Sequence, residues 1–390
     1  MGKISLVSDT INKEDIKALT DWLNQNPTPR LTKGELTVQL EKEWAEIIGT
    51  KYSVFVNSGS SAILLLLAAL KETKKYSNKI IVPALSWATD VSSPMLLGYE
   101  PILCDCNLHD LSCDLNQLEE LFSYHTSDKP TLFISVAPLG LVPDMDKILE
   151  LCEKYNFVLL EDICESMGSK YKGKMLGSFG LASTFSMYYG HLLSCIEGGL
   201  INTNDDELYN LLLAMRSHGW DRDENIEEQN KLRNEWNISD FQALYTFYYP
   251  GMNVRSTDLQ AFIGLRMFKR LDQYCKIRNK NYYLYQSYIK NNKLQLSDNS
   301  NSFIASFAYP MVHEKRDIIV KKLMENNIEV RPLIAGNMVN QPFWKKVYGK
   351  NKRILENAEI IDKYGFYLPN HQDLIDKSIQ FITKIINDCI

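Results

Sequence analysis

Short apolar runs rich in β-branched residues alternate with segments of helical periodicity along the first half of the chain. The runs predict strands at Ser53–Asn57, Lys79–Pro83, Glu100–Asp105, Thr131–Val136, Phe157–Asp162 and Gly199–Asn202. Apolar residues at helical spacing predict helices at Ser60–Thr73, Leu115–Ser123 and Met145–Asn156. Strands that alternate with helices are typical of a parallel sheet with crossover helices. The pattern therefore predicts an α/β fold.

The alternation ends near Gly219, and the rest of the chain follows a different pattern. Residues 220–236 are polar and charged, which predicts a long surface segment, and Leu259–Ile289 predicts one long amphipathic helix. Beyond that helix the pattern predicts strands at Phe303–Pro310 and Glu329–Pro332 and helices at Lys315–Asn327 and Lys377–Cys389. We therefore divide the chain into a large domain, residues 1–250, and a small C-terminal α/β domain, residues 251–390.

Charge and composition argue against several classes of protein. The 390 residues include 43 Lys and Arg and 48 Asp and Glu, a formal net charge of −5, and the basic residues form no runs. We therefore expect no nucleic-acid partner. The longest apolar stretch, Ala62–Leu70, has about half the ~20 residues of a membrane span, and no signal-peptide pattern opens the chain. We expect a cytoplasmic protein, free of membrane, whose eight scattered cysteines are reduced.

A serine-rich turn between a predicted strand and a predicted helix is the first candidate binding site. Backbone N–H groups at a helix start point outward, and hydroxyl groups add donors, so such a turn can bind a phosphate. The alternative is a serine helix cap that binds no ligand. The candidate phosphate ligands are Ser58, Gly59, Ser60 and Ser61.

Two more candidates follow predicted parallel strands, whose carboxyl ends meet at one edge of the sheet. Trp87 comes just after Lys79–Pro83 and offers an aromatic face on which a planar cofactor can stack. Asp162 ends the strand Phe157–Asp162, where a carboxylate can hold a protonated ring nitrogen and keep the ring electron-withdrawing. The alternatives are a core tryptophan that covers the sheet and an aspartate that caps a helix.

Residues 177–180, 183–191 and 196–199 complete an ordered series of motifs with the serine-rich turn, Trp87 and Asp162. This series resembles the fold-type I pyridoxal-phosphate enzymes of the DegT/DnrJ/EryC1/StrS family, and the resemblance spans nearly the whole chain. It implies an aspartate-aminotransferase-like fold, with a large, mostly parallel sheet domain and a small C-terminal α/β domain. The implied cofactor is pyridoxal 5'-phosphate or pyridoxamine 5'-phosphate. Glu165 and Ser186 are the further cofactor-binding residues that the resemblance implies.

His191 is where the chain departs from the aminotransferases of that family, which have a lysine here. Imidazole has no primary amine, so it cannot link covalently to the cofactor aldehyde, but it can take up and return a proton. In this position the chain resembles the dehydratase branch of the family, which has a histidine here. Residues 216–222 also resemble that branch. The alternatives are a structural histidine in an inactive relative, or a substitute lysine in the turn that holds Lys170, Lys172 and Lys174.

Iron–sulfur dehydratases of the same family bind their cluster through closely spaced cysteines. Residues 220–236 contain no cysteine, and Cys195 has no cysteine near it in the sequence. Because a cluster needs four thiolates, we expect no iron–sulfur cluster and no metal.

The resemblance implies a homodimer with composite active sites. Asn253, after Pro250 and Gly251, resembles a residue that reaches the partner's cofactor phosphate, and its alternative is a turn asparagine. Arg331 resembles an arginine that faces an anionic substrate group, and its alternative is a surface cation. His218 and Arg222 are further candidates for substrate binding, with a structural role equally open.

The implied activity is a 3-dehydratase that removes the C3 hydroxyl of a nucleotide-linked 4-keto-6-deoxyhexose, in the biosynthesis of deoxysugars and lipopolysaccharide O-antigen. His191 would move the proton, and an amino acid, by resemblance glutamate, would restore the aminated cofactor. The alternatives are a nucleotide-sugar aminotransferase of the same family and a relative that binds the cofactor without turnover. The sequence leaves the nucleotide, the sugar stereochemistry and the pathway open.

Overall fold

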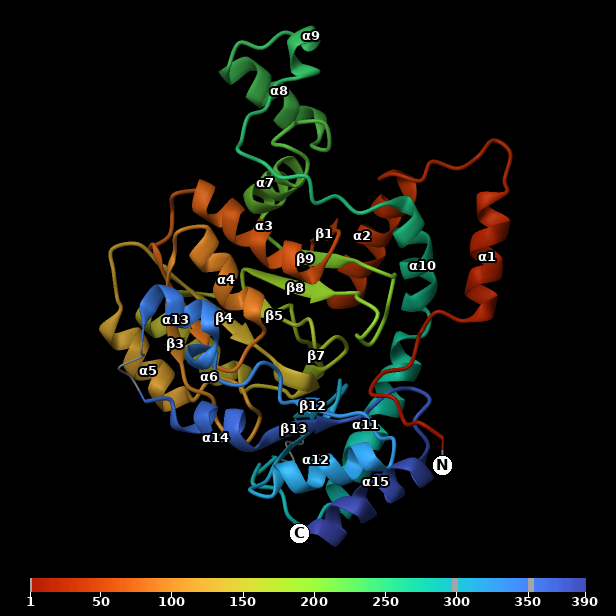
Figure 1. Ribbon diagram of the computed structural model, residues 1–390. Coiled ribbons are helices and arrows are strands. Elements are labelled where there is room, and N and C mark those ends of the chain that lie inside the picture. Colours follow the sequence, from red (N-terminus) through yellow and green to blue (C-terminus); the bar gives the residue numbers. More distant parts are fainter. Residues whose placement is uncertain (1, 297–300, 350–353) are drawn as a thin grey trace.

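The computed structural model describes residues 2–296, 301–349 and 354–390, and its core is a seven-stranded sheet (Figure 1). From β8 to β3 all neighbouring strands are parallel, and β9 is antiparallel to both β8 and β1. The prediction of an α/β fold with a large, mostly parallel sheet is therefore confirmed. In the order of pairing, the strands are β1 (Tyr52–Val56), β9 (Gly199–Thr203), β8 (Ala182–Ser186), β5 (Phe157–Asp162), β4 (Thr131–Val136), β2 (Lys79–Pro83) and β3 (Glu100–Cys104).

Helices connect these strands and cover the sheet. Helix α3 packs on β8 and β9 beside α4 and α7, whereas α5 and α6 pair with each other and pack on β3 and β5. Helix α3 is apolar on nearly every side, as expected for a buried helix, and it begins at the serine-rich turn. Within the described residues, no helix has the length and apolarity needed to cross a membrane. The helices of this part are α1 (Lys13–Leu23), α2 (Glu35–Ile48), α3 (Gly59–Glu72), α4 (Ala88–Leu96), α5 (Leu115–Tyr124), α6 (Met145–Tyr155) and α7 (Asp206–Arg216).

The C-terminal part is built on a small antiparallel sheet of β11 (Tyr309–Val312), β13 (Gly365–Leu368) and β12 (Arg331–Pro332). A third sheet, of β10 (Ser302–Phe303), β6 (Lys170–Tyr171) and β7 (Lys174–Met175), joins the two parts of the chain. Helix α10, the first after residue 251, packs on α2. The domain boundary at residues 250 and 251 stays a prediction. The helices are α10 (Asp258–Phe268), α11 (Leu271–Tyr288), α12 (Arg316–Glu325), α13 (Pro342–Tyr348), α14 (Glu356–Tyr364) and α15 (Asp376–Cys389).

The single helix predicted at Leu259–Ile289 is wrong: α10 and α11 are separate helices that meet at Lys269 and Arg270. The Arg270 guanidinium forms an ion pair with the buried carboxylate of Asp15, at 2.7 Å, on the N-terminal helix α1. Helical periodicity reflects only residues that are close in the sequence. It therefore cannot reveal a contact between residues as far apart as Asp15 and Arg270.

The strand predicted at Phe303–Pro310 is also wrong, because residues 304–308 separate β10 from β11. Carbonyl groups of this segment turn toward Arg278, a fully buried arginine of α11 that donates to the carbonyl of Phe307 at 2.8 Å. A backbone that faces a buried guanidinium cannot pair in a sheet at the same time.

Residues 220–249 form a surface arm, which carries α8 (Ile226–Glu235) and α9 (Asp240–Ala243) and projects from the body of the molecule (Figure 1). Several large apolar side chains of the surface arm are exposed. They are Ile226, Trp236, Phe241, Leu244, Tyr245 and Phe247.

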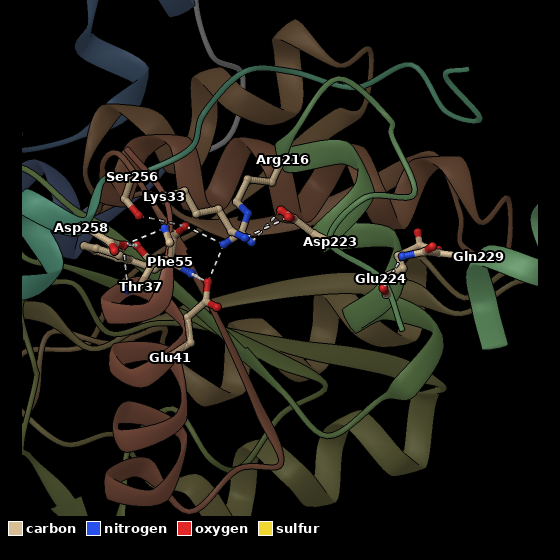
Figure 2. Close-up of polar contacts among 11 residues, drawn as sticks. Lys33, Thr37, Glu41, Phe55, Arg216, Asp223, Glu224, Gln229, Ser256 and Asp258 are labelled. Carbon is tan, nitrogen blue, oxygen red and sulfur yellow. Dashed lines mark hydrogen bonds and ion pairs between the residues drawn. The ribbon is translucent and has the colours of Figure 1, made fainter. Parts of the chain in front are cut away.

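A buried arginine anchors the arm to the edge strand β1 (Figure 2). Arg216, 0% exposed, forms ion pairs with Glu41 and with Asp223, the second at 3.3 Å. It also donates to the carbonyl of Phe55 at 2.9 Å, and Glu41 accepts from the backbone N–H of Phe55 at 2.8 Å. At Phe55 the outer edge of β1 is thus satisfied by side chains, shortly before the serine-rich turn.

Candidate active site

A pocket of about 760 Å³ lies where the carboxyl ends of the parallel strands face the C-terminal part. Binding sites of open α/β sheets occur at this edge. The pocket brings together residues from separate predicted motifs and from β12. The predicted site residues that line it are Ser58, Gly59, Ser60, Trp87, Asp162, Glu165, Ser186, His191 and Arg331.

The serine-rich turn opens helix α3 at one end of the pocket. Ser58 is the N-cap, and its Oγ accepts from the backbone N–H of Ser61 at 3.0 Å. A Cβ atom at Gly59 would lie 2.8 Å from the Cβ of Ser186 and 3.0 Å from the Sγ of Cys164, so only glycine fits here. The remaining N–H groups of the helix start are available to an anion. Ser61 itself does not line the pocket.

Trp87 and Asp162 offer complementary features to a planar heterocycle. Trp87 caps α4 and is 55% exposed, so a large part of its aromatic surface is open. Asp162 is buried at the end of β5, where its Oδ1 accepts from the backbone N–H of Cys164 at 3.0 Å and from the hydroxyl of Thr184 at 3.2 Å. These donors fix the carboxylate at the pocket wall.

Burial shifts the pKa values of four titratable side chains that line the pocket, which are Cys164, Glu165, His191 and Tyr367. Burial lowers the pKa of His191 from 6.5 to about 4, and the charge of Arg278 acts in the same direction. The Nδ1 atom of His191 has no hydrogen-bond partner in the described part of the chain. Burial raises the pKa of Glu165 to about 7, against a hydrogen bond from the Leu139 N–H. His191 is therefore neutral at pH 7 and able to accept a proton.

Besides Ser61, three of the predicted residues lie outside this pocket in the single chain. Asn253 is exposed and pairs with Ser217 in an isolated bridge. Arg222 is also exposed, and its guanidinium lies 3.8 Å from the ring centroid of Trp220 at the base of the surface arm. His218 packs against the same ring, at 5.1 Å between centroids. Arg331, in contrast, lies on β12 at the pocket rim.

The pocket also has lining residues that sequence reasoning missed. Phe307 and Tyr367 come from the C-terminal part, and no local motif marks them. Tyr188 and Tyr189 belong to the same motif as His191, and this position in the sequence was the signal that could have identified them. The N-terminal Leu6 reaches the pocket from the far end of the sequence.

Comparisons with known proteins agree with this geometry. Residues 9–387 match the DegT/DnrJ/EryC1/StrS aminotransferase family. The chain belongs to this family. It is 32% identical to the GDP-4-keto-6-deoxy-D-mannose 3-dehydratase of Yersinia pseudotuberculosis, over 99% of this chain and 98% of that protein.

Two solved structures of GDP-4-keto-6-deoxymannose-3-dehydratase are similar to the chain. One, with a trapped PLP-glutamate geminal diamine, has a TM-score of 0.87 at 30% identity and covers 98% of this chain and 99% of its own. The other, a mutant with bound GDP-perosamine, has a TM-score of 0.88 at 31% identity. The alignment covers 98% of this chain and 100% of that one. The predicted family and aspartate-aminotransferase-like fold are confirmed.

The donor set of the pocket suits pyridoxal phosphate. An anion site at the start of α3, an exposed indole and a buried carboxylate are the three groups that its phosphate, ring and ring nitrogen require. Among the described residues, no lysine lines the pocket and no group of three or more His, Cys, Asp or Glu is arranged to hold a metal ion.

Proposed function

We propose that the protein is a pyridoxamine-phosphate-dependent 3-dehydratase that acts on a GDP-linked 4-keto-6-deoxyhexose. The observation that carries the proposal is His191 in the cofactor pocket, in place of the lysine that the family's aminotransferases have. The full-length likeness to GDP-4-keto-6-deoxy-D-mannose 3-dehydratase supports the choice of sugar and nucleotide.

The chain's residues divide the work of binding. Ser58, Gly59 and Ser60 would hold the cofactor phosphate at the helix start, and Trp87 would stack on the ring. Asp162 would accept a hydrogen bond from the protonated ring nitrogen. When bound, the aminated cofactor supplies an amine for the sugar C4 ketone and a ring that withdraws electrons.

His191 moves the proton. Because its imidazole is neutral, it would take a proton from the C4′ carbon of the cofactor and return it to the C3 hydroxyl of the sugar, which would then leave as water. Imidazole leaves proton transfer as the only role of this side chain, whereas a lysine amine would also bond to the cofactor. The site thereby favours elimination over transfer of an amino group to the sugar.

The proposed reaction requires binding sites for two anionic groups, the diphosphate of the nucleotide sugar and the carboxylate of the amino donor. We assign the diphosphate of the nucleotide sugar or the carboxylate of the amino donor to Arg331, which lines the pocket and whose guanidinium can pair with either anion. Glutamate as the donor is supported by the glutamate adduct in the relative. Roles for His218 and Arg222 toward substrate require a second copy of the chain, because both lie outside the pocket of a single chain.

The activity is tested by incubating the purified protein with pyridoxal phosphate, glutamate and the GDP-, dTDP-, CDP- and UDP-linked 4-keto-6-deoxy sugars. We expect a glutamate-dependent 3-deoxy product and release of ammonia from the GDP-linked sugar, with no turnover by His191→Asn. An amino sugar as the main product would support the aminotransferase alternative instead. Cofactor binding without any product would support the non-catalytic alternative.

We further propose a homodimer in which Asn253 reaches the phosphate site of the partner. Its exposure outside the pocket and the apolar surface arm nearby support this arrangement. The test mixes inactive His191→Ala and Asn253→Ala subunits and lets them exchange. If Asn253 acts across the interface, a mixed dimer contains one intact site, so activity returns. No recovery after verified exchange would contradict the shared site.

A further inference from the structure

Asp90 is a fully buried carboxyl group behind the pocket wall. It is the third residue of α4, just after Trp87, and its backbone N–H donates to the Trp87 carbonyl at 3.2 Å. Its side chain is 0% exposed, and neither carboxyl oxygen accepts a hydrogen bond of normal geometry within the described part of the chain. A carboxyl group in such a place is costly to ionise.

The side chain of Asp90 lies within hydrogen-bonding reach of Asp162. The other groups that act on it are the carboxylate of Glu165, the thiol of Cys164 and the backbone of Trp87. Two carboxyl groups this close share a proton, since like charges repel at short range. Asp162 accepts from two donors, on Cys164 and Thr184, whereas the only donor directed at the Asp90 carboxyl group in the described part of the chain is the backbone N–H of Trp87.

We propose that Asp90 is a positioning residue, a neutral acid whose O–H donates to the Asp162 carboxylate and holds that carboxylate toward the ring-nitrogen site. The inference rests on the proposed function, because it assigns Asp162 to the cofactor. A donor at one oxygen of Asp162 holds that carboxylate in place and leaves its other oxygen to accept from the ring nitrogen. Burial and, next, the charge of Asp162 raise the pKa of Asp90 well above its usual range, against the backbone of Trp87.

The first experiment measures thermal unfolding of the full chain without added cofactor, at pH 5 and pH 8. A carboxyl group that is neutral only in the folded state weakens stability as the pH rises above its unfolded pKa of about 4. The melting temperature of Asp90→Asn relative to wild type should therefore rise by about 2 °C or more from pH 5 to pH 8. Ser93→Ala, a buried exchange on the same helix, should show no such trend. An Asp90→Asn difference independent of pH would overturn the proposal.

The second experiment follows the ring nitrogen of bound, ¹⁵N-labelled pyridoxal phosphate by NMR. Wild type and Asp90→Asn should both give the shift of a protonated ring, because the amide of asparagine can also donate to Asp162. Asp90→Leu, of similar size but without a donor, should move the signal toward the neutral ring. Identical signals from Asp90→Leu and wild type would refute the role.

Neither measurement uses a sugar substrate. If the dehydratase assay fails while the melting-temperature and NMR results are as expected, the failure counts against the proposed function and not against the role of Asp90. If Asp90→Leu does not fold, the stability trend of Asp90→Asn still decides the question.

Discussion

Replacing His191 by asparagine should change how the stability of the protein depends on pH. In the folded protein burial lowers the pKa of His191 from 6.5 to about 4. The unfolded chain therefore binds a proton that the folded protein does not, and the folded state loses stability as the pH falls from 6.5 toward 4. With these two values, His191 costs about 2 kcal/mol at pH 5 and almost nothing at pH 7.5. Asparagine cannot take up the proton and removes this cost.

The assay is urea unfolding of wild type and His191→Asn, without cofactor, from pH 5 to pH 7.5. The free energy of unfolding of the variant, relative to wild type, should rise by about 2 kcal/mol at the acidic end. Burial also lowers the pKa of His371 and His313, so the difference between the two proteins is the informative quantity. His191→Gln serves as the matched control and should give the same trend. A difference that stays constant over this range would refute a lowered pKa of His191 in the folded protein.

Three further changes test other parts of the argument. His191→Lys should abolish dehydration and gain a borohydride-reducible lysine–cofactor link, detected by peptide mass spectrometry, whereas wild type should give no lysine adduct. Asp162→Asn should reduce the turnover rate at least ~100-fold while cofactor binding, followed by absorbance titration, weakens less, because an amide cannot stabilise the protonated ring. Arg216→Met should lower the free energy of unfolding in urea by about 3–5 kcal/mol, because Glu41 and Asp223 lose their buried partner.

The sheet was predictable where strands are buried on both faces. Thr131–Val136 and Phe157–Asp162 match β4 and β5 in full, because central parallel strands have continuous apolar runs. Strand β8, Ala182–Ser186, is equally buried but was missed. Its serine and threonine side chains satisfy their hydroxyl groups locally, as when Ser183 donates to the carbonyl of Gly177 at 2.6 Å. Such a strand has no apolar run to recognise.

Individual residues of the candidate site were predictable where they lie at or just after the end of a predicted strand. Trp87 and Asp162 needed only the rule that parallel strands end at a common edge, and the structure brings both to the pocket. Asp90 gave no such signal, since an aspartate in the first turn of a helix is ordinary. Its burial against Asp162 depends on how α4 packs in the folded chain.

The environment of His191 is set largely by the C-terminal part of the chain. The imidazole lies against the ring of Phe307, at 5.4 Å between centroids. The carbonyl of Phe307 accepts from Arg278, which also donates to the carbonyl of Asn370 at 2.6 Å. Arg278 therefore ties together two segments after residue 300 and places a buried positive charge that helps to lower the pKa of His191. Because a charged imidazole could not accept a proton, the proposed role of His191, a residue of the loop between β8 and β9, depends on the packing of the C-terminal part.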